Sequence, residues 1–341
     1  MTLHPFHRAL RGLFILSLLG LLSGCYYVQA VQGQWAISRA AESVEVVIDD
    51  PATPEALQAR LQLTQEALAF AHTELGLPDN GSYRRYVDLQ RDFVVMNVFA
   101  TPAMSLDPKT WCYPFVGCVA YRGYFKAEAA EQYASRLSND GYDVFLGEVS
   151  AYSTLGKLKD PLLSTMFRRS DDSLIWLLFH EMAHQIIFVD NDTAFNESFA
   201  SAVADEGLKR WRVSRGETPP PVVPERSAQR TAKRQAIELL KAELTELYAR
   251  SQDEQVVLPA KQALFARLAD QWQKAGWSGR PPDNNAALVP AQLYADLRPA
   301  FAQFLKVQCA NDLECFYQRV IEMGALEPEA RLAPLKGTAA D

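Results

Sequence analysis

The sequence predicts an α+β fold in which a small sheet precedes a mainly helical second half. Three observations support this class. Short β-rich runs occur before residue 150, a strongly apolar helical segment covers residues 173–189, and apolar residues recur at helical spacing beyond a proline-rich run at 217–225. Separate runs of strands and of helices are typical of α+β architecture.

The first 24 residues have the pattern of an export signal. Arg8 and Arg11 form a short positive region, which is followed by an apolar run over 12–22. That run is too short to span a bilayer as a stable helix, and small residues before a cut site mark a secretory signal. The ending Leu-Ser-Gly-Cys resembles the bacterial lipoprotein box, whose cysteine, here Cys25, is lipidated and becomes the first residue of the mature protein. An ordinary signal peptide followed by a chance cysteine is the alternative.

The lipoprotein resemblance also implies a location in the bacterial cell envelope. Because Tyr26 rather than aspartate follows Cys25, the sorting rules of this class imply the outer membrane, with the protein facing the periplasm. Removing the first 24 residues, which carry two arginines and no acids, changes the formal charge from −7 to −9. Such an acidic chain gives no reason to expect nucleic acid as a partner, and no basic patch indicates anionic lipid. The acyl chains on Cys25 are therefore expected to supply the membrane attachment alone.

The other four cysteines form two local pairs of equal spacing, Cys112 with Cys118 and Cys309 with Cys315. Disulfides persist in exported proteins, so we expect each pair to close a small loop. Zinc binding by these thiols is the rival interpretation, although neither pair has the two-residue gap of a zinc knuckle.

The elements before the apolar segment include both helices and strands. An amphipathic helical pattern covers 53–75 and ends at glycine and proline, and a second helical pattern covers 128–139. Strands are predicted over 92–100, 117–124 and 142–149, where β-branched and aromatic residues gather.

Helices dominate the rest of the chain. The apolar helix at 173–189 follows Ser170, Asp171 and Asp172, which are candidate N-caps, and a second helix covers 194–210. Further helical patterns cover 227–250, 258–274 and 293–323.

The apolar helix contains the sequence His180-Glu181-Met182-Ala183-His184. Histidines four residues apart share one helix face, so both imidazoles can bind one metal ion. Glu181, beside the first histidine, can reach a water on the metal without binding the ion itself. Zinc lowers the pKa of such a water, and the glutamate takes its proton. The motif therefore predicts a catalytic Zn²⁺ site with His180 and His184 as ligands and Glu181 as the general base.

A chance match on a buried helix is the alternative to this site. Only His72, His180 and His184 remain after the export signal, and two of these three lie in the motif. The apolar run before His180 indicates a buried helix, where two histidines without a partner would cost burial energy. His72 lies far upstream on an amphipathic helix and is expected to be an ordinary surface or core histidine.

The third metal ligand must come from downstream, where the candidates are Asp190, Glu197 and Glu206. Asp190 would need an immediate reversal of the chain, and Ile187 supplies no glycine for it. Glu197 and Glu206 are nine residues apart, about 13 Å along one helix, so both cannot bind the same ion. Phe199 and Ala200 suit packing against the first helix, and we therefore predict Glu197 as the third ligand.

The segments His-Glu-Met-Ala-His-Gln (180–185) and Phe-Asn-Glu-Ser-Phe-Ala (195–200) resemble the zinc helix and the Asn-Glu-x-Phe-Ala helix of gluzincin zinc aminopeptidases of the aminopeptidase N type. The interval between His184 and Glu197 is shorter than in that family. Gly-Glu-Val-Ser-Ala (147–151) stands where that family has a Gly-x-Met-x-Asn strand.

The whole chain is more similar to a smaller group of bacterial lipoproteins described as predicted aminopeptidases. In that group a cysteine pair and an Ala-Tyr-Ser-Thr-Leu-Gly segment, here 151–156, precede the zinc helix. The resemblance implies a zincin-like catalytic part over 25–216, on whose core we expect the helical part at 217–341 to pack.

The same resemblance implies further site residues. Gluzincins bind an extended peptide along an edge strand before the zinc helix, and residues 142–149 stand in that place. Tyr152 would then stabilise the oxyanion over the metal, and Glu148 is a weaker candidate for binding a substrate amine. Independently of the resemblance, Asp205 and Glu206 are candidates for orienting a ligating imidazole. The alternatives are an ordinary half-buried tyrosine and solvated acids.

The leading hypothesis is a membrane-anchored zinc metallopeptidase, an aminopeptidase, that hydrolyses peptides. The alternatives are a zinc endopeptidase and a non-catalytic peptide-binding or envelope-assembly lipoprotein on the same fold. An intact Glu181 favours an enzyme, because binding alone does not need a general base. The sequence identifies neither a protein partner nor a preferred substrate side chain.

Overall fold

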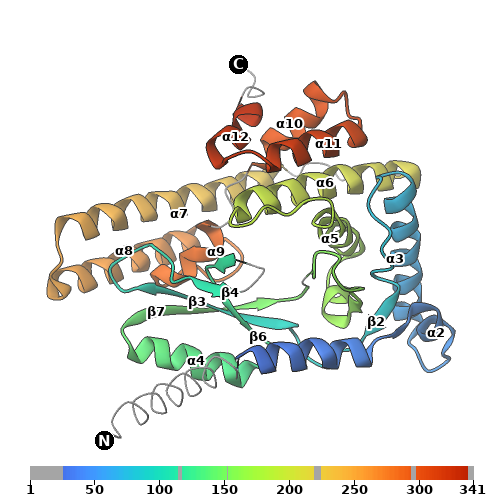
Figure 1. The fold of residues 1–341 in the computed structure, drawn as a ribbon. Helices are drawn as coiled ribbons and strands as arrows, with labels where there is room; N and C mark the ends of the chain where they lie inside the picture. The colour runs from blue at the N-terminus through green and yellow to red at the C-terminus, as the bar shows by residue number, and fades with distance from the viewer. Residues whose placement is uncertain (1–25, 114–116, 152, 219–223, 293–296, 337–341) are drawn as a thin grey trace, which may run out of the picture.

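The computed structural model describes residues 26–113, 117–151, 153–218, 224–292 and 297–336. Its fold is α+β, as the sequence predicts (Figure 1). The predicted export signal and Cys25 lie outside the described residues, so their roles stay predictions. In the part of the chain that is described, no helix is both long and apolar enough to cross a membrane.

The main sheet is antiparallel and has the strand order β6-β3-β7, formed by Arg122–Tyr124, Val95–Pro102 and Tyr142–Val149. The strand predicted at 142–149 is β7, and the one predicted at 92–100 is β3 with shifted ends. β7 lies at the sheet edge, with Val149 opposite Val95 on β3. Helix α4 (Ala127–Asn139), which matches the helical pattern at 128–139, packs on this sheet.

The prediction of a single strand at 117–124 is wrong, because this segment contributes to two different sheets. Its first part is β5 (Gly117–Val119), which pairs with β4 (Trp111–Tyr113) in a hairpin. The chain then crosses to β3, where its second part pairs as β6. Cys112 and Cys118 are opposite each other in the hairpin, and a disulfide joins them as predicted. A third sheet contains β1 (Glu42–Ser43), β2 (Arg85–Val87) and β8 (Leu162–Leu163).

Helices α5 (Asp171–Ala183) and α6 (Thr193–Ser214) cross the centre of the main hydrophobic core. The side chain of Ser170 accepts a hydrogen bond from the N–H of Ser173, which confirms it as the N-cap of α5. α6 approaches α5 closely at Gly207, where a Cβ would lie 2.9 Å from a ring carbon of Phe179. Helix α3 (Glu55–Thr73), predicted at 53–75, packs beside both.

The predicted helix at 173–189 is too long, because α5 ends at Ala183. The apolar residues that follow Ala183 still pack on the core, but they belong to the connection between α5 and α6 and are not helical. The amide of Asn196 fixes this connection: it accepts from the N–H of Val189 and donates to the C=O of the same residue, both at 2.8 Å. The α5–α6 connection is therefore fixed by α6 itself.

The last helices pack on α6, at the top of Figure 1. The ring of Phe301 on α10 (Arg298–Gln308) contacts those of Phe195 and Phe199 on α6. The helical stretch predicted at 293–323 is interrupted after α10 by Ala310 and Asn311, which have positive φ, and α11 (Leu313–Gly324) follows. The predicted Cys309–Cys315 disulfide spans this break. Helix α12 (Pro328–Lys336) completes the group.

Helices α7 (Pro224–Arg250) and α8 (Glu254–Lys274) form a hairpin with a hydrophobic core of its own. A buried polar cluster joins this hairpin to the main sheet. The ammonium of Lys261 on α8 lies 2.5 Å from a carboxylate oxygen of Asp143 on β7 and donates to the carbonyl of Ala103. The same carboxylate oxygen of Asp143 accepts from the N–H of Asn285, which lies in the 3₁₀ turn Asn285–Leu288 before α9 (Val289–Gln292).

We expect Lys261→Met to lower the free energy of unfolding by about 3–5 kcal/mol, because it leaves the Asp143 carboxylate buried without its cation. The side chains of Lys261 and Asp143 are only 8% and 16% exposed. Lys274→Met is the matched control on the same helix, since its ion pair with Asp270 is exposed and contributes at most about 1 kcal/mol. Urea unfolding of the two variants measures the difference, and equal losses would contradict the prediction.

Candidate metal centre

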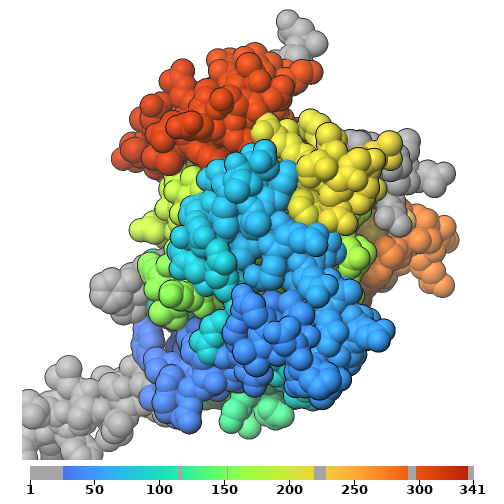
Figure 2. Space-filling model, turned by 90° about the vertical axis from the view of Figure 1, so that its right-hand side faces the viewer, coloured from blue at the N-terminus to red at the C-terminus, as the bar shows by residue number. Residues whose placement is uncertain are grey.

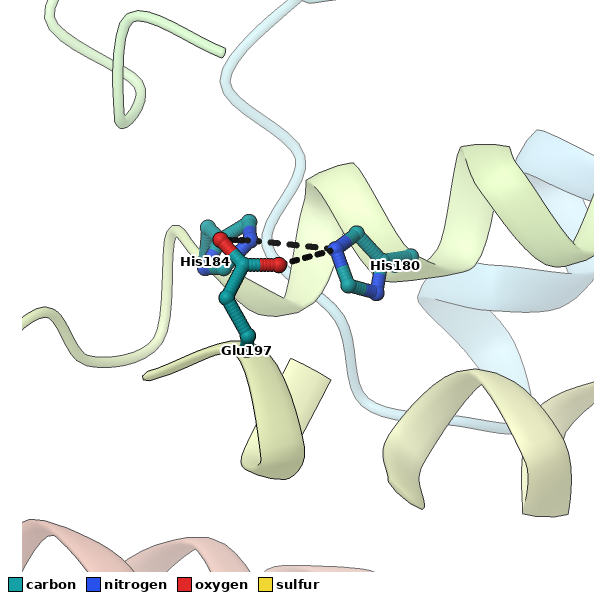
Figure 3. A group of neighbouring side chains, drawn as sticks. All are labelled: His180, His184 and Glu197. Carbon is teal, nitrogen blue, oxygen red and sulfur yellow. Dashed lines mark hydrogen bonds and ion pairs between the residues drawn. The ribbon is translucent and has the colours of Figure 1, made fainter. Parts of the chain in front are cut away.

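The last turn of α5 places His180 and Glu181, and His184 caps its end. The apolar positions Leu174, Leu177 and Leu178 bury this helix in the main core, and the burial extends through the motif. His180, Glu181 and His184 are all less than 10% exposed. The two imidazoles point toward the same side, with ring centroids 4.8 Å apart (Figure 3).

Glu197 comes from the start of α6. The carboxylate of Asp192 accepts from the N–H of Phe195 and caps the start of this helix. The first turn of α6 therefore faces the end of α5, and Glu197 projects its carboxylate toward the two histidines (Figure 3).

The distances between these three side chains fit a tetrahedral metal ion. The Nε2 atoms of His180 and His184 are 3.2 Å apart. The Glu197 carboxylate oxygens lie 3.2 Å from Nε2 of His180 and 3.6 Å from Nε2 of His184. Ligand atoms bound at about 2 Å to a tetrahedral ion are about 3.3 Å from one another. The three side chains therefore lie close enough together to hold one metal ion.

The chemistry of the donors supports the same conclusion. Burial lowers the pKa of His184 to about 4, so its imidazole is neutral at physiological pH. A neutral imidazole is the form that binds a metal, and each neutral ring carries one nitrogen lone pair. Burial of Glu197 would by itself raise the pKa of its carboxyl, but the hydrogen bond with His180 and the nearby imidazoles lower it overall. A carboxylate and two facing ring nitrogens form a set of donors suited to a cation.

Glu181 lies beside this group and is only 9% exposed. Burial raises the pKa of the Glu181 carboxyl to about 7, the nearby His180 opposes this shift, and the neighbouring Glu197 and Asp160 add to it. Asp160 is itself buried and accepts from the N–H of Thr154, in the segment that precedes α5. A carboxyl with a pKa near neutrality can both accept and release a proton at neutral pH.

Two side chains that support His180 were not identified from the sequence. The indole of Trp176 stacks on the His180 ring, with centroids 4.9 Å apart and planes 24° apart. The hydroxyl of Ser201 lies 3.5 Å from Nδ1 of the same ring. Trp176 precedes His180 by four residues and Ser201 follows Glu197 by four, so helical spacing was a signal that could have found both.

The acids proposed to orient an imidazole do not contact one. Asp205 accepts from the indole N–H of Trp176 at 2.7 Å, so it reaches His180 only through the stacked indole. Glu206 pairs with Lys209 and Arg210 on its own helix, at 3.0 and 2.8 Å.

The remaining candidates lie apart from the three converging side chains. Asp190 is exposed in the α5–α6 connection. Nδ1 of His72 lies 2.9 Å from the carbonyl of Leu77, as suits an ordinary histidine. Glu148 is exposed on β7, and Tyr152 lies outside the described residues. Within the described ranges, His180, His184 and Glu197 are the grouping that could hold a metal ion.

Comparison with known proteins gives a match to a protein family. A family model named Aminopep, described as "Putative aminopeptidase", matches residues 25–335. No curated protein and no solved structure matches the chain. Because the family match covers most of the sequence and includes every residue of the candidate metal centre, the chain belongs to the Aminopep family.

Proposed function

We propose that the protein is a zinc-dependent aminopeptidase that hydrolyses peptides in the cell envelope. The convergence of His180, His184 and Glu197 at metal-ligand distances carries this proposal. Two nitrogens and one carboxylate leave a fourth position of a tetrahedral ion open, which distinguishes catalytic zinc sites from structural ones. The family match supports a peptidase independently of this geometry.

Each residue of the metal centre would have a separate role in this reaction. His180 and His184 through Nε2, and Glu197 through its carboxylate, would hold the ion. When bound, zinc supplies a lowered pKa to a coordinated water and polarises the peptide carbonyl. Glu181 accepts the proton of the attacking water and delivers it to the departing amine. Trp176 and Ser201 keep the His180 ring in place, which preserves the geometry during turnover.

The edge strand β7 supports a peptide as the substrate. No strand pairs with its outer edge among the described residues, although Asn284 donates to the carbonyl of Val144 near its beginning. An extended peptide could add there as a further strand. The end of β7 leads to the metal centre: Arg169, which lowers the pKa of Glu181, donates to the hydroxyl of Ser150. An endopeptidase is the second candidate, because an edge strand suits peptides of any length.

We expect the purified chain to bind one zinc ion and to hydrolyse amino-acid amides with a free amino group. Metal content by elemental analysis and turnover of a small panel of amides test the two parts. Removal of the metal by a chelator should abolish turnover, and added Zn²⁺ should restore it. N-acetylated forms of the same amides are the matched control: their hydrolysis at equal rates would indicate an endopeptidase. A zinc-loaded chain that hydrolyses nothing would indicate a binding protein.

We also propose that acyl chains on Cys25 attach the protein to the outer membrane. The lipoprotein-box sequence supports this, and the family match begins at the same residue. Cys25→Ser should prevent acylation and remove the mature protein from its membrane fraction. Mass spectrometry of the N-terminal peptide and cell fractionation measure both effects. An unchanged distribution of the variant would exclude Cys25 as the anchor.

A further inference from the structure

Residues 26–40, which follow Cys25 in the sequence, are helical and expose an apolar stripe. Tyr27, Val31 and Trp35 recur every four residues and therefore share one face, with Val28 beside them. Their exposed fractions are 42%, 68%, 60% and 52% for Tyr27, Val31, Trp35 and Val28, respectively. Large apolar side chains this exposed and this closely spaced mark an interaction surface.

The opposite face of this helix is attached firmly to the sheet. The amide of Gln29 donates to the carbonyl of Gly123 and accepts from the N–H of Phe125, at the end of β6. Gly33 allows the close approach, because a Cβ there would lie 2.2 Å from the ring of Phe125. Ile37 is buried in the main core. The exposed stripe is thus held in a fixed orientation and is not the outer face of a loose tail.

The helix at 26–40 differs in charge from the rest of the protein. Residues 26–40 contain no acidic residue and a single base, Arg39, in a chain whose formal charge is −7. The guanidinium of Arg39 lies over the Trp35 ring, 4.7 Å from its centroid, at the end of the stripe. Tyrosine and tryptophan favour the boundary between lipid and water, and an arginine beside them can reach the headgroups.

We propose that the stripe formed by Tyr27, Val28, Val31 and Trp35 lies in the interface of the lipid bilayer. This inference rests on the proposed attachment at Cys25, which would place the start of the helix at the membrane surface. It adds a second attachment to the acyl chains, which were expected to act alone. The helix lies along the surface and does not span the bilayer, as amphipathic interfacial helices do.

This arrangement fixes the orientation of the whole molecule. The helix at 26–40 runs along the bottom of Figure 1, and helices α10, α11 and α12 lie at the opposite end. Figure 2 shows the same order from another side, with the first described residues at the base and the last at the top. The bilayer would lie beneath the base, with α4 and the main sheet nearest to it and α10 to α12 farthest away.

The test uses the mature chain, which starts at Cys25. The other four cysteines form disulfides, so Cys25 provides the free thiol that can be coupled to a maleimide phospholipid in vesicles of brominated phosphatidylcholine. Bromine quenches tryptophan fluorescence at short range. We expect part of the fluorescence to be quenched, and we expect Trp35→Phe to remove that part although five other tryptophans remain.

Two double variants examine the stripe itself. Val28→Gln with Val31→Gln should reduce the quenching of Trp35 at least twofold. Leu239→Gln with Val307→Gln, which changes exposed apolar residues of α7 and α10, should leave it unchanged. Adding anionic lipid should have little effect, because the stripe is apolar and carries one charge at its end.

Equal quenching of the unmodified chain and Trp35→Phe would overturn the proposal, and so would a concentration-dependent dimer that shields Trp35 without quenching. Circular dichroism verifies that each variant is folded. The measurement needs neither zinc nor turnover, and chemical coupling replaces natural acylation. Its failure is therefore distinguishable from failure of the proposed peptidase activity or of the lipid anchor.

Discussion

Glu181→Gln is expected to lower kcat by roughly 10²- to 10⁴-fold, because it removes the general base and keeps the shape of the side chain. The amide cannot accept the proton of the attacking water. Glu181 is not one of the three side chains that would hold the metal ion, so the variant should retain one metal ion per chain. Steady-state kinetics on the best amide of the panel and elemental analysis of the same sample measure the two effects.

Glu148→Gln is a useful control for this variant, because it makes the same chemical change at an exposed residue of β7. It should leave kcat within a few-fold of the unmodified protein, although KM rises if Glu148 binds the substrate amine. Full activity of Glu181→Gln would refute the proposed mechanism even if the metal content were as expected.

Glu197→Ala is expected to weaken metal binding by more than about 100-fold and to abolish turnover with it. Loss of a residue that only orients a ligand typically costs 10- to 100-fold in affinity, and loss of a ligand should cost at least as much. Glu197 supplies the carboxylate of the group, so its removal leaves only the two imidazole nitrogens for a divalent cation. Titration with a competing zinc chelator measures the affinity.

Glu206→Ala is the matched control on the same helix. Glu206 pairs with Lys209 and Arg210 and lies apart from the histidines, so its removal should leave metal affinity and activity unchanged. Loss of these pairs should cost at most about 1 kcal/mol of stability. If Glu206→Ala lost the metal while Glu197→Ala kept it, the assignment of the third ligand would be wrong. The similarity to the Asn-Glu-x-Phe-Ala helix would then be misleading.

Much of the local structure follows from short stretches of sequence. The spacing of His180 and His184 predicts their common face, because the helix repeat alone determines it. Ser170 was among the candidate N-caps because a serine side chain can bond backbone groups two or three residues away, as it does here with the N–H of Ser173. The strand over 142–149 was predicted from its own residues, and both disulfides were predicted from the close spacing of the cysteines in a chain expected to be exported.

The errors occurred where the tertiary structure overrides the local pattern. The apolar pattern at 173–189 predicts one helix, yet Asn196 from the next helix holds Val189 in a connection. The strand predicted at 117–124 divides because two different strands offer hydrogen-bond partners to its two halves. In both cases the hydrogen-bond partner lies outside the predicted segment, so the pattern within that segment could not reveal it.

By itself, the sequence determined the metal motif, the α+β class and the cap region before α5, all of which depend on interactions within a few residues along the chain. Only the tertiary structure shows which acid lies beside the two histidines, namely Glu197. It alone also shows that Trp176 stacks on His180 and that Lys261 is buried against Asp143. These contacts depend on how closely and at what angle α5, α6, α8 and β7 pack. That geometry arises from burial of the whole core, because the free energy of packing is shared among many residues and no single segment encodes it.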